Sequence, residues 1–79
     1  MVHELKTWPT FFHLVDNGVK KFEIRKNDRG FEAGHFLLLR EWDPETNEYT
    51  GKTCRASIQY VLQGGQFGVE PGYVVMSIK

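Results

Sequence analysis

The sequence predicts one small domain, mainly β with a single helix, in the order β-α-β-β-β-β. A chain of 79 residues is long enough for one domain at most. Its 41% hydrophobic and 14% aromatic content is typical of a folded chain. Five strand-like segments with short links and one segment of helical spacing are too few for a two-layer α/β fold. We therefore expect residues 1–79 to form a small, partly closed β-barrel with the helix covering one end.

The first two elements are a short strand and the helix. His3–Lys6 is the expected first strand. Thr7 before Trp8-Pro9 is typical of a helix start, because a hydroxyl can cap the helix and proline is tolerated in the first turn. Asn17-Gly18 is a suitable end, since glycine readily adopts the left-handed conformation there. These signals predict a helix at Pro9–Asn17.

The next strand is predicted from strict alternation at Lys21–Lys26. Phe22 and Ile24 share one face, while Glu23 and Arg25 share the other together with the first lysine. The polar pair therefore leaves the strand on a single side.

Three further strands follow, separated by turn and loop residues. A turn at 27–30 leads to His35–Trp42, whose Phe36–Leu39 run predicts burial on both faces. A hairpin loop at 43–47 precedes a return that begins at 49–51, where Gly51 is a candidate bulge. The return continues as a strand at Thr53–Leu62, and a glycine-rich loop at 63–72 precedes the last strand, Tyr73–Ile78.

The expected core includes two large aromatic side chains. We expect Trp8 and Tyr60 to be buried, the latter on the same face of its strand as Cys54 and Ile58. The single cysteine excludes an internal disulfide and is expected to be a buried, inert thiol. Phe67, in the glycine-rich loop, is the best candidate for an exposed aromatic side chain.

Charge is spread unevenly along the chain. The formal net charge is zero, so the chain as a whole is not a polyanion binder. Residues 20–29, however, carry five basic and two acidic side chains. The N-terminal residues lack an apolar signal region and no stretch reaches transmembrane length, so we expect a cytoplasmic protein with no membrane partner.

The basic stretch contains the residues that could carry chemistry. Glu23 can accept hydrogen bonds and Arg25 can donate a planar fork, so in a cleft the pair could bind a nucleobase edge or a phosphate. In solvent it would be an ordinary ion pair. Lys20 could turn into a cleft and act as a base, or it could simply extend its ammonium to water.

Gly18-Val19-Lys20-Lys21-Phe22-Glu23-Ile24-Arg25 fits the pattern G-x-K-x-x-E-x-R, and this stretch resembles the signature of the ASCH domain, a branch of the PUA-like superfamily. The segments "LREWDPETNEYTGK", "YVLQGGQFG" and "EPGYVVMSI" resemble a small bacterial and phage subfamily of it. The resemblance implies a PUA-like β-barrel whose cleft, between helix and sheet, binds RNA or a nucleotide-like ligand. It implies four site positions: Gly18, Lys20, Glu23 and Arg25.

A related small ASCH protein is an amidohydrolase that acts on acylated cytidine-type nucleosides. The resemblance gives Lys20 the position of that enzyme's lysine, but Glu23 stands where the enzyme has a threonine. The enzyme also uses a further glutamate, for which Glu41 and Glu70 are candidates. His35 is another departure, because the family usually has aspartate there.

Three functions therefore stay open. The first is an RNA- or nucleotide-binding module, with Lys21, Lys26 and Arg29 attracting phosphates and Phe67 stacking on a base. The second is a small amidohydrolase in which Lys20 and Glu23 are catalytic, and the third is a protein-interaction domain. No cofactor is expected, and the three histidines show no metal-ligand spacing.

Overall fold

The computed structural model describes residues 1–79 and contains one helix and five strands. Their order along the chain is the predicted one, strand-helix-strand-strand-strand-strand. The elements are β1 (Val2–Thr7), α1 (Pro9–Asp16), β2 (Phe22–Lys26), β3 (Phe36–Asp43), β4 (Glu48–Gln63) and β5 (Tyr73–Ile78). No helix is long and apolar enough to cross a membrane.

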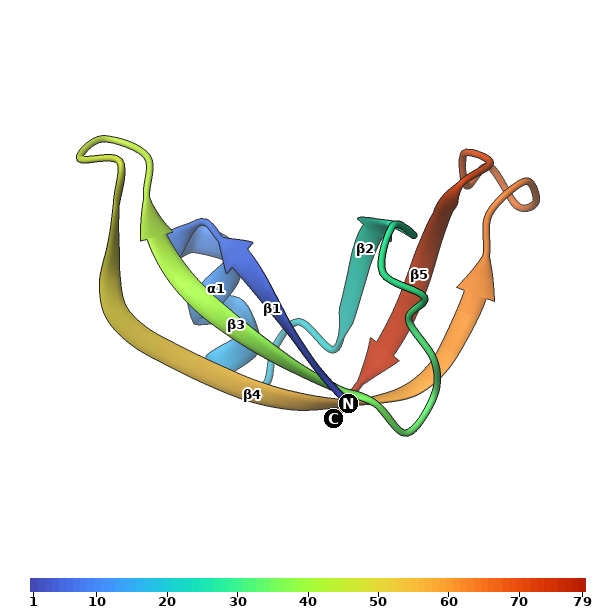
Figure 1. The fold of residues 1–79 in the computed structure, drawn as a ribbon, viewed down its shortest axis with the longest axis horizontal. Coiled ribbons are helices and arrows are strands. Elements are labelled where there is room, and N and C mark those ends of the chain that lie inside the picture. Colours follow the sequence, from blue (N-terminus) through green and yellow to red (C-terminus); the bar gives the residue numbers. More distant parts are fainter.

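The five strands form one mixed sheet in the order β1-β3-β4-β5-β2. β1 runs parallel to β3, and the other neighbours are antiparallel. β4 is long and curved, and it passes beneath both arms of the sheet (Figure 1). One arm contains β1, β3 and the first half of β4, and the other contains β5, β2 and the second half of β4.

The sheet is open, so the fold is mainly β as expected but the barrel does not close. β1 and β2 are its two edges. Backbone carbonyls of β1 at Glu4 and Lys6 accept hydrogen bonds from the guanidinium groups of Arg29 and Arg25. The gap between the edge strands β1 and β2 is called the seam. It is bridged by side chains from β2 and the turn after it, where a closed barrel would have backbone hydrogen bonds between the two strands.

Two irregularities bend β4 and change which residues point inward. Residues 50–52 of β4 lie opposite the single β3 residue Glu41, and Gly51 has φ +91°, which confirms the predicted bulge. A second register shift lies between Ile58 and Tyr60. It reverses the alternation, so Val61 packs against the core and Tyr60 is 62% exposed. The predicted burial of Tyr60 is therefore wrong.

The core is apolar and lies on the concave face of the sheet. It consists of Leu5, Phe12, Val15, Phe31, Leu37, Leu39, Ala56, Ile58, Val74, Met76 and Ile78. The helix packs against β3 and β4 and contributes Phe12 and Val15. The prediction that the Phe36–Leu39 run is buried on both faces is wrong, because Phe36 is exposed and only alternate residues of the run are fully covered.

The start of the helix differs from the prediction. Trp8, rather than Thr7, is the N-cap residue, and no side chain caps the helix. Thr7 is instead the last, buried residue of β1, and Trp8 is 54% exposed, which contradicts its predicted burial. The helix ends one residue earlier than predicted, at Asp16, and Gly18 has the expected left-handed conformation with φ +74°.

Candidate functional site

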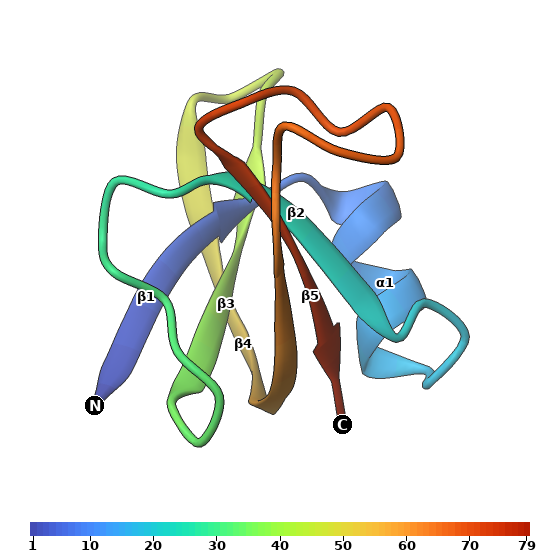
Figure 2. The same ribbon diagram turned by 90° about the vertical axis from the view of Figure 1, so that its right-hand side faces the viewer.

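A pocket of about 640 Å³ is lined by residues from the end of β1, the start of α1 and the edge strand β2. Figure 2 shows how these three elements are arranged. Its size falls in the range of small-molecule sites. The lining residues are Lys6, Thr7, Trp8, Phe11, Lys20, Phe22, Glu23, Ile24 and Arg25. The pocket thus contains Lys20, Glu23 and Arg25, three of the four positions implied by the signature.

Glu23 is the buried centre of the pocket. Its side chain is only 4% exposed. Glu23 Oε1 accepts a hydrogen bond of 2.7 Å from Lys20 Nζ, and Glu23 Oε2 accepts one of 3.0 Å from Arg25 Nε. Charged hydrogen bonds of this kind are stronger than neutral ones, and here they compensate a carboxylate that would otherwise be costly to bury.

The register of β2 explains why this carboxylate points inward. Glu23 lies opposite Met76 of β5 and Arg25 lies opposite Val74, and both β5 residues are fully buried. Residues directly opposite one another share a face of the sheet. The polar side of β2 therefore faces the interior, while Phe22 and Ile24 are 45% and 54% exposed.

The two cations are held by backbone groups as well as by Glu23. Lys20 Nζ donates to the Phe22 carbonyl at 2.9 Å, and Arg25 Nη2 donates to the Lys6 carbonyl at 3.1 Å. The amides of residues 19 and 20 both donate to the Leu14 carbonyl, which ties the segment after Gly18 to the helix. Lys20 and Arg25 are thus fixed from two directions.

Exposed apolar side chains surround this polar centre. Trp8 and Phe11, at the start of α1, are each about half exposed. Lys20 Nζ lies 4.9 Å from the centre of the Phe22 ring and 5.8 Å from that of Phe11, within cation–π range. The arrangement is a charged floor with aromatic walls, which suits a flat ligand that carries polar groups.

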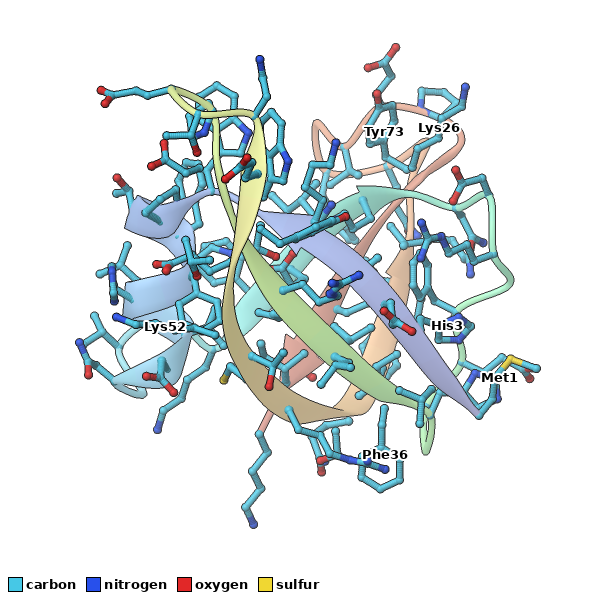
Figure 3. All side chains as sticks on the ribbon, turned by 60° about the vertical axis from the view of Figure 1, so that its left-hand side comes forward. Met1, His3, Lys26, Phe36, Lys52 and Tyr73 are labelled. Carbon is cyan, nitrogen blue, oxygen red and sulfur yellow. The ribbon has the colours of Figure 1, made fainter.

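The other predicted site residues lie outside this pocket. Lys21 lines a smaller hollow of about 160 Å³ near the C-terminal residue, together with Arg55. Lys26 is exposed at the far end of β2 beside Tyr73, well away from Lys52 (Figure 3). The guanidinium of Arg29 binds the β1 carbonyl across the seam and lies 3.8 Å from Asp28.

Two more of the predicted positions make no direct contact with the pocket. Phe67 is 85% exposed, as expected, at the tip of the β4–β5 loop. Gly18 lies in the turn that leads into Lys20 and lines the smaller hollow. Neither candidate for the further glutamate, Glu41 or Glu70, lines the pocket.

Six of the nine lining residues were not predicted as site residues: Lys6, Thr7, Trp8, Phe11, Phe22 and Ile24. Trp8 and Phe11 are three residues apart, which places them on one side of the helix start. Phe12 and Val15, the buried residues of α1, occupy a different side. The signal that could have identified Trp8 and Phe11 as pocket residues is their position on a different side of the helix from its buried residues.

A second polar cluster lies where α1 meets β3 and β4, away from the pocket. Glu41 is buried, and its Oε1 accepts a hydrogen bond of 2.7 Å from Thr50 Oγ1. Its Oε2 lies 3.1 Å from His13 Nε2 but is not aligned for a hydrogen bond. The contact joins α1 to β3, so this cluster is suited to holding the helix on the sheet.

Two further groups have perturbed proton affinities. Burial lowers the pKa of His3, and the neighbouring His35, whose Nδ1 lies 3.0 Å from His3 Nε2, and Arg29 lower it further. Burial and the nearby Asp16 raise the pKa of the Cys54 thiol, which opposes formation of a reactive thiolate. No group of three or more metal-ligating side chains occurs in the chain.

Comparison with known proteins identifies the family. The family model described as "Domain of unknown function (DUF3850)" matches residues 2–78. The chain is also 40% identical over 57 residues to the "Uncharacterized 12.9 kDa protein in GpA 3'region" of Escherichia phage P2. That alignment covers 72% of this chain and 50% of the phage protein, so the chain spans about half the length of this relative. The chain belongs to the DUF3850 family.

Proposed function

We propose that the domain binds single-stranded RNA or a nucleotide-like small molecule in the pocket around Glu23. The observation that carries the proposal is the buried Glu23 carboxylate, joined to Lys20 and Arg25 beneath half-exposed aromatic rings. Flat bases stack on aromatic side chains, and cationic groups bind phosphates. A purely structural ion pair has no need of aromatic walls open to solvent.

We further propose that the family is a branch of the PUA-like superfamily, related to the ASCH domain. Support comes from the pattern G-x-K-x-x-E-x-R, since its lysine, glutamate and arginine are Lys20, Glu23 and Arg25, and Glu23 contacts both of the others. The open mixed sheet, with a helix at one side of the pocket, supports the same relationship.

The test is a titration of the 15N-labelled protein with a pool of short single-stranded RNAs at low salt. We expect resonance shifts at the Trp8 indole and at the amides of residues 20–25. Few cations line the pocket, so a plot of log affinity against log salt concentration should have a shallow slope of roughly −1 to −2. Absence of binding at low salt both by the RNA pool and by mononucleotides, or shifts confined to residues outside the pocket, would contradict the proposal.

A second candidate, an amidohydrolase acting on acylated nucleosides, is favoured by one observation. The buried hydroxyl of Thr7 lines the same pocket as the Lys20 amine and the Glu23 carboxylate. Thr7 Oγ1 currently donates to the Leu5 carbonyl at 3.3 Å. Release of acetate from an N-acetylated cytidine, abolished in Lys20→Ala and in Thr7→Val, would support this activity. No release at high enzyme concentration would exclude this substrate.

A further inference from the structure

The hydrogen bonds of the pocket determine which of its groups are free to meet a ligand. Both carboxylate oxygens of Glu23 are occupied, one by Lys20 and the other by Arg25. The side chain is almost completely buried between these two cations. Glu23 is therefore poorly placed to accept a hydrogen bond from the edge of a base.

The two cations retain unused donors. Lys20 Nζ carries three hydrogens and donates to two protein acceptors, Phe22 O and Glu23 Oε1. Arg25 uses Nε and Nη2, while its Nη1 makes no hydrogen bond within the chain. Both side chains line the pocket, so the floor presents N–H groups and needs acceptors from the ligand.

The charge of the lining favours an anionic acceptor. Lys6, Lys20 and Arg25 line the pocket, and Glu23 is the only acidic residue among the nine. Lys6 Nζ lies 4.3 Å from the centre of the Trp42 ring, and Trp42 does not line the pocket, so Lys20 and Arg25 are the two cations whose side chains face it. A positive lining under low-dielectric aromatic walls strengthens the attraction of a negative group.

We propose that Lys20 Nζ and Arg25 Nη1 bind the phosphate group of a nucleotide, while its base packs on Trp8 and Phe11. Glu23 is then a positioning residue that holds the two cations at a fixed separation. This inference rests on the proposed function and specifies its chemistry: the pocket recognises the phosphate rather than the base edge. The phosphate comes from a free mononucleotide or from a strand of RNA, and the two sources are separable by experiment.

The open edge of β2 gives the ligand a further contact. Lys21 O accepts from Ile78 N and Asn27 N donates to Gly72 O, so odd-numbered residues of this segment pair with β5. In an antiparallel pair the intervening residues point their backbone groups the other way. The N–H and C=O of Ile24 therefore face the pocket side, where they can hydrogen-bond the sugar or base of the same nucleotide.

Two matched pairs of ligands test the inference by chemical-shift titration. The first pair is adenosine and adenosine 5′-monophosphate, and the second is a dinucleotide with a natural phosphodiester and its uncharged methylphosphonate analogue. The charged member should bind roughly tenfold more tightly or better in at least one pair, because a charged hydrogen bond is lost in the other member. A preference in the first pair identifies a mononucleotide site, and a preference in the second alone identifies a strand site.

The outcomes separate this inference from the proposed function. Equal affinity of charged and uncharged ligands, with shifts at Trp8 and residues 20–25, overturns the phosphate inference and leaves nucleotide binding intact. If none of the four ligands binds and RNA pools also fail, both proposals fail. Binding of the pools alone, with no preference in either pair, overturns the phosphate inference only.

Variants test the roles of the individual residues. Arg25→Gln leaves Glu23 its lysine partner and should reduce the preference for the charged ligand several-fold, since Lys20 alone remains to bind the phosphate. Lys52→Gln removes an exposed charge that does not line the pocket and is the control, since it should keep the preference.

Glu23→Gln distinguishes positioning from simple charge. Removing a negative charge would tighten phosphate binding several-fold if Glu23 acted only through its field. We expect several-fold weaker binding, because the cations lose the group that fixes them. Tighter binding in a variant with a native-like spectrum would overturn the positioning role.

Discussion

The central strands and the edge strands of the same sheet differ in what they bury. β3, β4 and β5 turn apolar side chains inward, and Leu37, Leu39, Val74 and Met76 have no exposed surface. The edge strands β1 and β2 bury His3, Thr7 and Glu23, with Leu5 as their single buried apolar residue. These three are most of the buried polar residues of the chain, the fourth being Glu41 on β3.

The contrast does not arise from depth, because β2 and β5 are paired residue by residue. Met76 and Glu23 lie opposite each other on the same face, and both are almost fully buried. The difference lies in the seam: β2 borders the opening between the two edges, where Lys20 and Arg25 can reach the carboxylate. The central strands supply most of the hydrophobic stabilisation, and the edges keep polar groups close to solvent, where a ligand can reach them.

The largest expected effect is a difference in stability between a central and an edge strand when an isoleucine in each is replaced by alanine. Ile58→Ala removes a side chain that is 1% exposed and should cost about 2–5 kcal/mol of unfolding free energy. Ile24→Ala, at a position 54% exposed, should cost less than about 1 kcal/mol. Urea unfolding of both variants measures the difference. Equal losses would mean that the edge contributes to the core as much as the centre does.

The next effect concerns the buried charge at the edge. Glu23→Leu leaves Lys20 and Arg25, which are only 15% and 28% exposed, without their counterion. We expect a loss of about 1–3 kcal/mol, below the value for a fully buried pair because both cations can move toward water. Lys52→Leu, at an exposed position, should change stability little. Unfolding curves of the two variants provide the comparison. An unchanged stability of Glu23→Leu would show that Lys20 and Arg25 lose nothing when their counterion is removed.

A smaller effect on stability, with a large effect on binding, is expected when the whole cluster is replaced. The triple variant Lys20→Met, Glu23→Leu, Arg25→Met removes all three charges together and leaves none unpaired. Its stability should lie within about 2 kcal/mol of the native value, because apolar residues often replace buried ion pairs without loss. Nucleotide binding should disappear. A triple variant that is much less stable than Glu23→Leu alone would assign the cluster to the fold rather than to a site.

The sequence predicted the elements of the sheet better than it predicted which of their side chains are buried. Alternation and turn residues predicted all six elements and the bulge at Gly51, because local patterns encode these features. Tyr60 and Trp8 were misassigned for non-local reasons: a register shift in β4 turned one outward, and the seam left the other beside the pocket. The alternation of β2 separated Glu23 and Arg25 from Phe22 and Ile24 but could not tell which face points inward. That choice depends on pairing with β5, which lies some fifty residues later in the chain.

The smallest expected effect is an acid sensitivity located at the β1 edge. Burial, with His35 and Arg29 nearby, lowers the pKa of His3 below its ordinary value of 6.5. As pH falls through 6.5, the unfolded chain therefore binds a proton that the folded chain resists, and stability decreases until the lower folded pKa is passed. Above neutral pH His3 is neutral in both the folded and the unfolded chain, so the stability no longer depends on its protonation.

Melting temperatures between pH 7.5 and 5.5 measure this loss in a range where most carboxylates stay ionised. His3→Gln should flatten the decrease, whereas Lys52→Gln, at an exposed position of β4, should retain it. Hydrogen exchange adds the location, because amides of β1 should lose protection on acidification before those of β5. If the melting temperatures of the wild type and of His3→Gln fall equally with decreasing pH, the β1 edge tolerates protonation of His3 and the prediction is wrong.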